Sequence, residues 1–499
     1  MAEHLINIEE ARENLLACAA FLAEDIKSGD GFGEAMREIV PRYLEKGKVD
    51  LAAQLADSID DPFVRDRLLS NVAEKCAEIG DDEYAFQLVE AVEDTGLQSE
   101  ARERIAVRKA EQGEFENAFE IATALDHPAH ALGVIAYQLT IKNQETEAKQ
   151  TLERIEYPAA KVNALQLIAE FYEKNNQKEK ANNTLDEAVT AAQEIDFPEE
   201  KIRVLQYIAE HFAQNGGRDK AVETFDKAKT ETEKLGNVYR DSFLVGISLG
   251  FLRAGSLELA DRTLDAVAEK TQIATCLLGF AREFWAKGDA SEAHETLEES
   301  YQILKSQRDS EIRDSRARFN LLAAVAVEFA QFGKAERAIE IAHGLPDESE
   351  QTSALSQIAR VCTFQGNDQL TRQAINAIGE DAQKMFALIN VSDAKNRLEK
   401  RGEAIEILNE AAHLAETVPQ LAARSTALNE LAARFAEYNQ NERVRELSLE
   451  NLQTIAQIRD ESSRAVALAH LNDVYEKANF ALNDAEIMIL QTMIRRAEW

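Results

Sequence analysis

Residues 165–185 read LQLIAEFYEKNNQKEKANNTL, and residues 205–225 repeat the same frame as LQYIAEHFAQNGGRDKAVETF. In both stretches, apolar residues stand four before, one before and three after a small anchor, Ala169 or Ala209. This spacing places the apolar side chains on one face of an α-helix. A second apolar stretch follows after a break at an asparagine or a glycine. The frame therefore predicts a helix, a turn and a returning helix.

The same frame recurs thirteen times, so internal repetition is the main feature of this sequence. The anchors of the thirteen copies are Val40, Ala73, Ala106, Ala136, Ala169, Ala209, Ser248, Ala281, Ala326, Ala359, Ser392, Ala432 and Asn472. Six of the twelve intervals between anchors are 33 residues, and four of the longer ones are 39 or 40 residues. The excess is close to two helical turns of about 3.6 residues each. We expect it to lengthen a helix and to return its apolar face to the same side.

Two other positions of the frame have a physical reason. The residue seven after the anchor is Gly or Asn in twelve copies, with Glu399 the exception, which suits the left-handed residue that ends a helix. The residue twelve after the anchor is Ala in ten copies, which offers a small contact on the returning helix. Prolines, which stop a helix, fall where one copy hands over to the next. These are Pro62, Pro128, Pro158, Pro198, Pro346 and Pro419.

The frame resembles that of the tetratricopeptide repeat (TPR) family, in a divergent form of the bacterial type. The family pattern has a small residue followed by an aromatic one, and later an alanine and a second aromatic. The residues that match it at the family's spacing include Ile208, Ala209, Phe212, Ala221 and Phe225. The family's early Trp is replaced here by Leu, and many copies lack the second aromatic. The resemblance covers about residues 34 to 490 and implies an all-α fold, a right-handed α-solenoid of about 13 TPR-like helix-turn-helix repeats.

We expect one elongated domain, because no internal linker interrupts the solenoid at residues 34–483. Residues 1–33 are expected to form an N-terminal helix and then a flexible glycine-rich connector. A capping box that begins at Asn7 opens this helix, which we expect to end near Lys27. Residues 484–499 are expected to form a capping helix that closes the far end.

The first and last copies depart most from the frame. Copy one has Pro41 inside its first helix, and copy thirteen has Asn472 and Asp484 at small positions. Because a solenoid needs polar ends, we expect these two copies to be degenerate caps. The glycine run at residues 29–33 lacks the preceding strand and the Gly-Lys-Ser/Thr ending of a phosphate loop, so we interpret it as the connector.

Composition and charge exclude several classes of function. The 499 residues include 56 Lys and Arg against 90 Asp and Glu, a net charge of −34. This balance disfavours binding to nucleic acid and to anionic lipid, because both need a basic surface. The longest apolar stretch, residues 243–252, is too short to span a bilayer, and no signal peptide is visible, so we expect no membrane insertion. Four scattered cysteines without a CxxC pair suit a reducing cytoplasm, which is the predicted location.

No motif predicts chemistry. The eight histidines are dispersed, none lies in an HExxH pattern, and no GxSxG or Walker A spacing occurs. We therefore predict no catalytic residue, no metal and no cofactor, and a protein that is not an enzyme. An enzyme built on helical repeats is the less favoured alternative, by analogy with superhelical lyases.

The first helices of the resembling family line a concave groove that receives peptides or partner helices. Positions off the apolar stripe hold mostly Glu in copies one to six, but Arg and aromatic residues in copies seven to eleven. Arg and aromatic residues are enriched where protein interfaces bind most strongly. The predicted groove residues are Arg253, Arg282, Trp285, Arg360, Phe364, Phe386, Asn390 and Arg397, with Ile389 at a further groove position.

These observations predict a scaffold or adaptor that binds a protein or peptide, acidic or amphipathic, in the groove. The alternative interpretation is that the Arg residues pair with neighbouring Glu and the aromatics pack within the solenoid. Gly246, Gly250 and Gly279 lie in the middle of first helices, where they either open room for a ligand or allow close helix packing. A regulatory solenoid that senses a peptide or another ligand is the second functional alternative. The sequence leaves the oligomeric state open.

Overall fold

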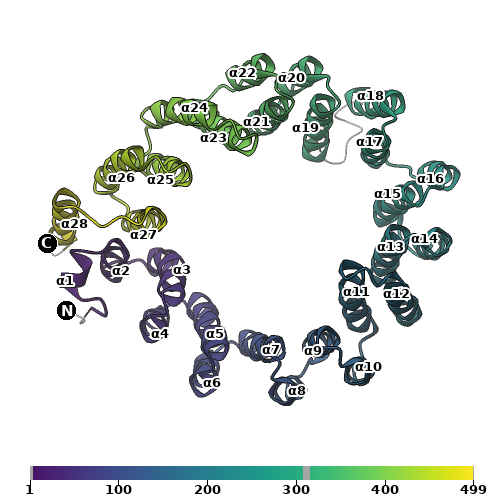
Figure 1. The fold of residues 1–499 in the computed structure, drawn as a ribbon, viewed down its shortest axis with the longest axis horizontal. Helices are drawn as coiled ribbons and strands as arrows, with labels where there is room; N and C mark the ends of the chain where they lie inside the picture. The colour runs from purple at the N-terminus through teal and green to yellow at the C-terminus, as the bar shows by residue number, and fades with distance from the viewer. Residues whose placement is uncertain (1–3, 307–314, 498–499) are drawn as a thin grey trace. The chain divides into compact units, whose positions relative to one another are not determined.

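A computed structural model describes residues 4–306 and 315–497. Within these ranges it contains α-helices α1 to α28 and no strand, which confirms the all-α solenoid of helix-turn-helix units (Figure 1). The first helices of the thirteen copies are α3 (Gly29–Glu45), α5 (Pro62–Ile79), α7 (Thr95–Gln112), α9 (Ala129–Ile141), α11 (Pro158–Lys174), α13 (Pro198–Gln214), α15 (Asn237–Arg253), α17 (Lys270–Ala286), α19 (Ser315–Gln331), α21 (Glu348–Phe364), α23 (Asp381–Arg397), α25 (Leu421–Glu437) and α27 (Glu461–Ala478).

Each first helix is followed along the chain by a second one. The following helices are α4 (Val49–Asp57), α6 (Asp82–Ala91), α8 (Phe115–Thr123), α10 (Glu145–Glu153), α12 (Lys178–Ala192), α14 (Arg218–Thr232), α16 (Leu257–Leu264), α18 (Ala290–Ser306), α20 (Ala335–His343), α22 (Asp368–Asn376), α24 (Arg401–Ala415), α26 (Asn441–Ile455) and α28 (Asp484–Ala497). Two further helices, α1 (Ile8–Ala11) and α2 (Leu15–Glu24), precede the first copy.

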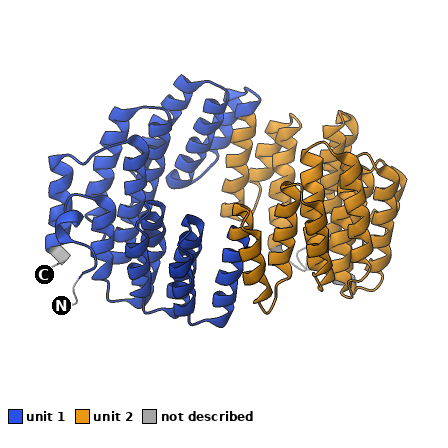
Figure 2. Ribbon diagram, turned by 60° about the horizontal axis from the view of Figure 1, so that its bottom comes forward, with its two compact units in different colours: residues 1–108, 363–499 blue, residues 109–362 orange. Residues whose placement is uncertain are grey.

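The chain divides into two compact units (Figure 2). Unit 1 consists of residues 1–108 and 363–499, and unit 2 consists of residues 109–362. We expected one elongated domain, but both ends of the chain belong to unit 1. The physical reason is that the first and last copies pack on each other, as described below.

The anchors lie where the two helices of a copy meet. All thirteen are buried. Ser248 and Ser392 show the contact directly, because each donates its hydroxyl to the carbonyl twelve residues later, of Ala260 and Ala404, at 2.8 Å. The anchor and the small residue twelve positions later therefore face each other, as the frame predicts.

The break between the helices is left-handed in every copy. The residue seven after the anchor has a φ between 51° and 86° in all thirteen copies. Glu399, the one exception in sequence, has a φ of 61° and so adopts the same conformation. Position in the repeat therefore determines this backbone angle, even where the residue type disfavours the left-handed conformation.

The lengths of the second helices confirm the interpretation of the longer intervals. Helices α12, α14, α24 and α26 each have 15 residues. In 33-residue copies the corresponding helices are shorter, such as α10 and α20 with 9 residues each. The added residues extend the second helix without changing the frame of the next copy.

Two predictions for residues 1–33 are wrong. The glycine run is not a flexible connector, because α3 begins at Gly29 and the Ser28 hydroxyl accepts a hydrogen bond from the Gly31 amide. A Cβ on Gly31 would lie 3.5 Å from the Cβ of Ser462, an ordinary van der Waals distance, so the start of α3 packs against α27. The single N-terminal helix is in fact two, because Asn14 caps a new helix, α2, three residues after α1 ends.

The two terminal copies are not polar caps. Within unit 1, α27 packs against α2 and α3, so each end of the chain covers the other (Figure 1). Helix α28 packs against α26 and α2 instead of closing an exposed end. The expectation failed because an end that another repeat covers needs no polar surface.

Candidate partner-binding surface

All eight predicted groove residues lie on first helices, as expected from the repeat frame. Arg253 is on α15, and Arg282 and Trp285 are on α17. Arg360 and Phe364 are on α21, and the remaining three are on α23. Four of the eight belong to unit 2 and four to unit 1. Each half is therefore described by itself, and one continuous groove containing all eight stays a prediction.

In unit 2, successive copies leave a hollow of about 340 Å³ between α13, α14 and α15. We call it the unit 2 hollow. Its lining consists of Glu210, Ala213, Gln214, Phe225, Gly250 and Arg253. Phe225 and Gly250 give it an apolar interior, and Glu210, Gln214 and Arg253 add polar groups that donate and accept hydrogen bonds. Its volume is in the range of small binding pockets.

Arg253 joins three successive first helices through ion pairs. Its Nε donates to Glu283 at 2.7 Å, and its Nη1 donates to Glu210 at 3.1 Å. Partial burial works against its charge, but the hydrogen bonds to Glu283 and Glu210 outweigh this and raise the pKa of Arg253. The guanidinium is therefore held in place at the edge of the hollow.

Arg282 and Trp285 are also engaged within unit 2. The Arg282 Nε donates to Glu328 at 2.7 Å, and Glu328 is only 8% exposed. Trp285 stacks on Phe332 with ring centroids 4.5 Å apart, while 38% of its surface remains exposed. The alternative interpretation, pairing with neighbouring Glu, is thus confirmed for Arg253 and Arg282.

Two of the other predicted arginines and two predicted phenylalanines are exposed. Arg360 in unit 2 and Arg397 in unit 1 are exposed and form no ion pair with another described residue. In unit 1, Phe364 and Phe386 are each 43% exposed. The predicted placement of Ile389 in the groove is wrong, because this side chain is only 3% exposed.

Three residues of α23 form one exposed stripe. Phe386, Asn390 and Arg397 are exposed, and their spacing of four and seven residues places them on the same face of the helix. Ile389 lies one residue off this stripe and points into the core. A partner-binding role for this stripe of α23 stays a prediction.

Polar contacts also link the first helices of successive copies, and they were not predicted from the sequence. In unit 2, His211 contacts Glu173 at 2.9 Å, and Tyr207 is hydrogen-bonded to Glu170. Burial and the hydrogen bond to Glu170 raise the pKa of Tyr207. Tyr207 and Glu170 stand two residues before and one residue after their anchors, whereas His211 and Glu173 stand two and four residues after theirs. The two pairs therefore share no common spacing that would have predicted them.

The mid-helix glycines allow close packing. A Cβ on Gly246 would lie 2.7 Å from Gln206 Nε2, and one on Gly279 would lie 2.5 Å from a Leu249 methyl group. At Gly250 it would lie 2.2 Å from the Phe225 ring. Gly250 also lines the unit 2 hollow, and a role in making room for a ligand there stays a prediction.

Potential metal ligands and thiols can be placed in the part of the chain that the structure describes. Among the residues that the structure describes, no group of three or more His, Cys, Asp or Glu side chains could hold a metal ion. The four cysteines, Cys18, Cys76, Cys276 and Cys362, are free and buried. Burial raises the pKa of Cys276 to about 11, far from the range of a reactive thiol. Over the described ranges, no helix is long and apolar enough to cross a membrane.

Comparisons with known proteins extend the description of the fold only. No family model matches the sequence, and no curated protein matches it. Ton1535 from Thermococcus onnurineus is a similar solved structure, with 15% identity and a TM-score of 0.27 over 71% of this chain and 98% of that one. Human IFIT1, solved as a dimer with PPP-AAAA, has 15% identity and a TM-score of 0.28 over 82% and 95%. A Rap protein complexed with competence and sporulation factor has 13% identity and a TM-score of 0.27 over 78% and 99%.

Similarity at these identities and TM-scores carries no information about what this chain binds.

Proposed function

We propose that this chain is a non-catalytic, divergent TPR-type scaffold or adaptor, and that unit 2 binds an amphipathic segment of a partner protein at the first helices α13, α15 and α17. The observation that carries the proposal is the unit 2 hollow. Its Phe225 and Gly250 lining accepts an apolar side chain of the partner, and its polar edge meets the polar face of the same segment.

The contacts of the arginines make an amphipathic partner a better fit than an acidic one. Arg253 already binds Glu210 and Glu283, and Arg282 already neutralises the nearly buried Glu328. An acidic partner would have to displace these carboxylates. A segment with mixed donors and acceptors instead adds hydrogen bonds to Glu210 and Gln214 without breaking an ion pair.

Trp285 extends the proposed surface beyond the hollow. Its exposed edge lies on α17, the next first helix after α15, and its stacking on Phe332 keeps the indole in one orientation. A fixed aromatic ring binds at a low cost in side-chain entropy, which is typical of residues that dominate interface affinity.

The raised thiol pKa values support a role without nucleophilic catalysis, and free thiols suit the cytoplasm.

Blocking the hollow tests the proposal. A library of random 16-residue peptides displayed on phage is selected against the full chain, and the enriched peptides are synthesised. Ala213→Glu places a charged side chain in the lining of the hollow from a half-buried position. We expect enriched peptides to be amphipathic and to bind this variant at least about tenfold more weakly in fluorescence anisotropy.

Ala436→Glu is the matched control, because Ala436 is half-buried, occupies the same frame position as Ala213 and lies on α25 in unit 1. This variant should bind the peptides like the wild type. Equal binding by both variants, or selection that enriches no peptide, contradicts the proposal. Arg282→Glu is unsuitable as a test because it leaves Glu328 buried beside a second negative charge.

A further inference from the structure

Helix α2 occupies the place of the second helix in the last repeat. In the first twelve copies, the helix that follows the break begins nine residues after the anchor, but α28 begins twelve residues after Asn472. Helix α28 then packs on α26 and α2. The helix that lies along α27, as second helices lie along first helices elsewhere, is α2 from the other end of the chain.

The sequence of α2 fits this role. Asn14 accepts a hydrogen bond from the amide three residues later at 2.9 Å, and Asp81 and Asn367 do the same at the start of the second helices α6 and α22. In a second helix, the small residue that faces the anchor lies four residues after such a cap. In α2 this position is Cys18, which is fully buried. Nine of the ten residues of α2 are buried, so this helix is apolar on all sides.

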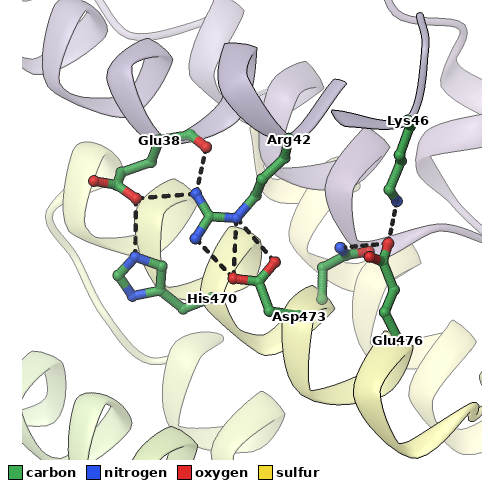
Figure 3. Close-up of polar contacts among 7 residues, drawn as sticks. Glu38, Arg42, Lys46, His470, Asp473 and Glu476 are labelled. Atoms are coloured by element: carbon green, nitrogen blue, oxygen red, sulfur yellow. Dashed lines mark hydrogen bonds and ion pairs between the residues drawn. The ribbon is translucent and has the colours of Figure 1, made fainter. Parts of the chain in front are cut away.

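The contact between α27 and α3 has the register of a regular repeat contact. Arg42, two residues after its anchor, donates to Asp473, one residue after its own anchor, with a shortest distance of 2.8 Å (Figure 3). The same frame positions pair between neighbouring copies elsewhere in unit 1. Arg108 contacts Glu74 at 2.9 Å, and Arg434 contacts Asp393 at 3.5 Å.

Further polar contacts surround this pair. His470 contacts Glu38 at 3.1 Å, and Lys46 forms an ion pair with Glu476 (Figure 3). The Ser462 hydroxyl donates to Glu34 at 2.8 Å. We call the contact of α2 and α3 with α27 the end clasp. It joins residues more than 400 positions apart by the contacts of a normal repeat interface.

We propose that the end clasp opens locally, and that open clasps exchange between two copies of the chain, so that α2 and α3 of one copy complete the last repeat of the other. Every other first helix is joined to its second helix by a short covalent turn, whereas α27 and α2 are held together by packing, and α27 and α3 by packing and polar contacts. Such a contact can open without straining the chain. The faces it exposes are complementary to the same faces of a second copy, which is the condition for domain swapping.

This proposal involves none of the residues of the unit 2 hollow, so its failure leaves the proposed function unaffected. It predicts a partner of definite chemistry: a second copy, recognised through the apolar α2 and the Arg42, Lys46, Asp473 and Glu476 charges.

Two charge-reversed full-length variants test it. Variant X carries Arg42→Asp and Lys46→Glu, and variant Y carries Asp473→Arg and Glu476→Lys. In X alone and in Y alone, like charges face each other across the end clasp. A thiol reagent should therefore modify Cys18 at least about threefold faster in each variant than in the wild type. Cys276 in unit 2 is the internal control, and its rate should not change.

A mixture of X and Y tests exchange. Opposite charges meet only when α3 of one variant packs on α27 of the other, so we expect the mixture to form species of twice the 55.6 kDa chain mass in native mass spectrometry. X alone, Y alone and a chain with all four substitutions should stay monomeric, and the last should protect Cys18 like the wild type. A mixture that stays monomeric contradicts exchange, and wild-type Cys18 rates in both X and Y contradict the opening.

Discussion

Glu399 shows how strongly the repeat constrains single residues. It has a φ of 61°, a conformation that twelve other copies fill with Gly or Asn. Side chains with a Cβ are disfavoured in this region by roughly 1–2 kcal/mol. The left-handed angle was predictable from position alone, because the break falls at the same distance from every anchor.

Glu399→Gly should therefore stabilise the protein. We expect the free energy of unfolding to rise by about 0.5–1 kcal/mol, because the relief of strain exceeds the added flexibility of the unfolded chain. Urea unfolding followed by circular dichroism measures it. Glu399→Ala keeps a Cβ and serves as the control, and a Gly variant no more stable than the Ala variant would refute this reading.

Lys395 is a buried charge that the apolar frame did not predict. It stands three residues after its anchor and is 3% exposed, and its Nζ contacts Asp368 and Glu403 at 2.6 Å each. The hydrogen bonds to Lys395 lower the pKa of both carboxyls. The frame marks this position as apolar, and the partners come from two copies, so spacing alone could not pair them.

The lowered carboxyl pKa values set the sign of a pH effect. A carboxyl whose pKa is lower in the folded protein adds stability above its unfolded pKa, and this stability is lost as the pH falls through the folded value. Lys395→Met removes the ion pairs and should leave stability at pH 7 within about 1.5 kcal/mol of the wild type. From pH 6 to pH 3, the wild type should lose more stability than this variant in thermal unfolding. Equal losses would show that these pairs do not stabilise the fold.

At the scale of the element, the frame determines where helices begin, and the interval determines how long the second helix is. From Leu185 in α12 to Ile195, just after the helix ends, the spacing is ten residues, whereas from Leu152 in the short helix α10 to Ile155, just after its end, it is three. Both isoleucines are buried. The difference of seven residues leaves the apolar face in the same direction.

Deleting residues 186–192 should convert α12 into a short second helix. We expect this variant to keep the helical circular dichroism of the remaining residues and to unfold cooperatively. Deleting only residues 186–190 rotates Ile195 off the apolar face and should be less stable by about 2 kcal/mol or more. Equal stability of the two deletions would mean that the register of the second helix does not matter.

The binding surface at this scale was predicted in part. The sequence identified the helices that carry exposed Arg and aromatic residues, because off-stripe positions follow from the helical period. It did not identify which arginines are paired, because Glu283 and Glu328 come from the next copy along the chain. The hollow beside Gly250 depends on how close two helices approach, and spacing does not give that distance.

At the scale of the whole molecule, the closing of unit 1 by both chain ends lay beyond the sequence analysis. The frame relates neighbours along the chain, whereas the end clasp relates residues such as Arg42 and Asp473. Two signals were present: α2 is apolar throughout, and the spacing after Asn472 is longer than in other copies. Neither signal shows, without the structure, that α2 packs on the last repeat.

The first and last copies meet in the same way as copies that are neighbours along the chain. The most direct test places cysteines at Arg42 and Asp473 in the full chain and treats dilute protein with a bis-maleimide. Cysteines at Arg434 and Asp393, which pair between successive copies of unit 1, give the reference yield. We expect a cross-link within the monomer at a similar yield, identified by mass spectrometry of the joined peptides. A reference pair that cross-links while the Arg42 and Asp473 positions do not would contradict it.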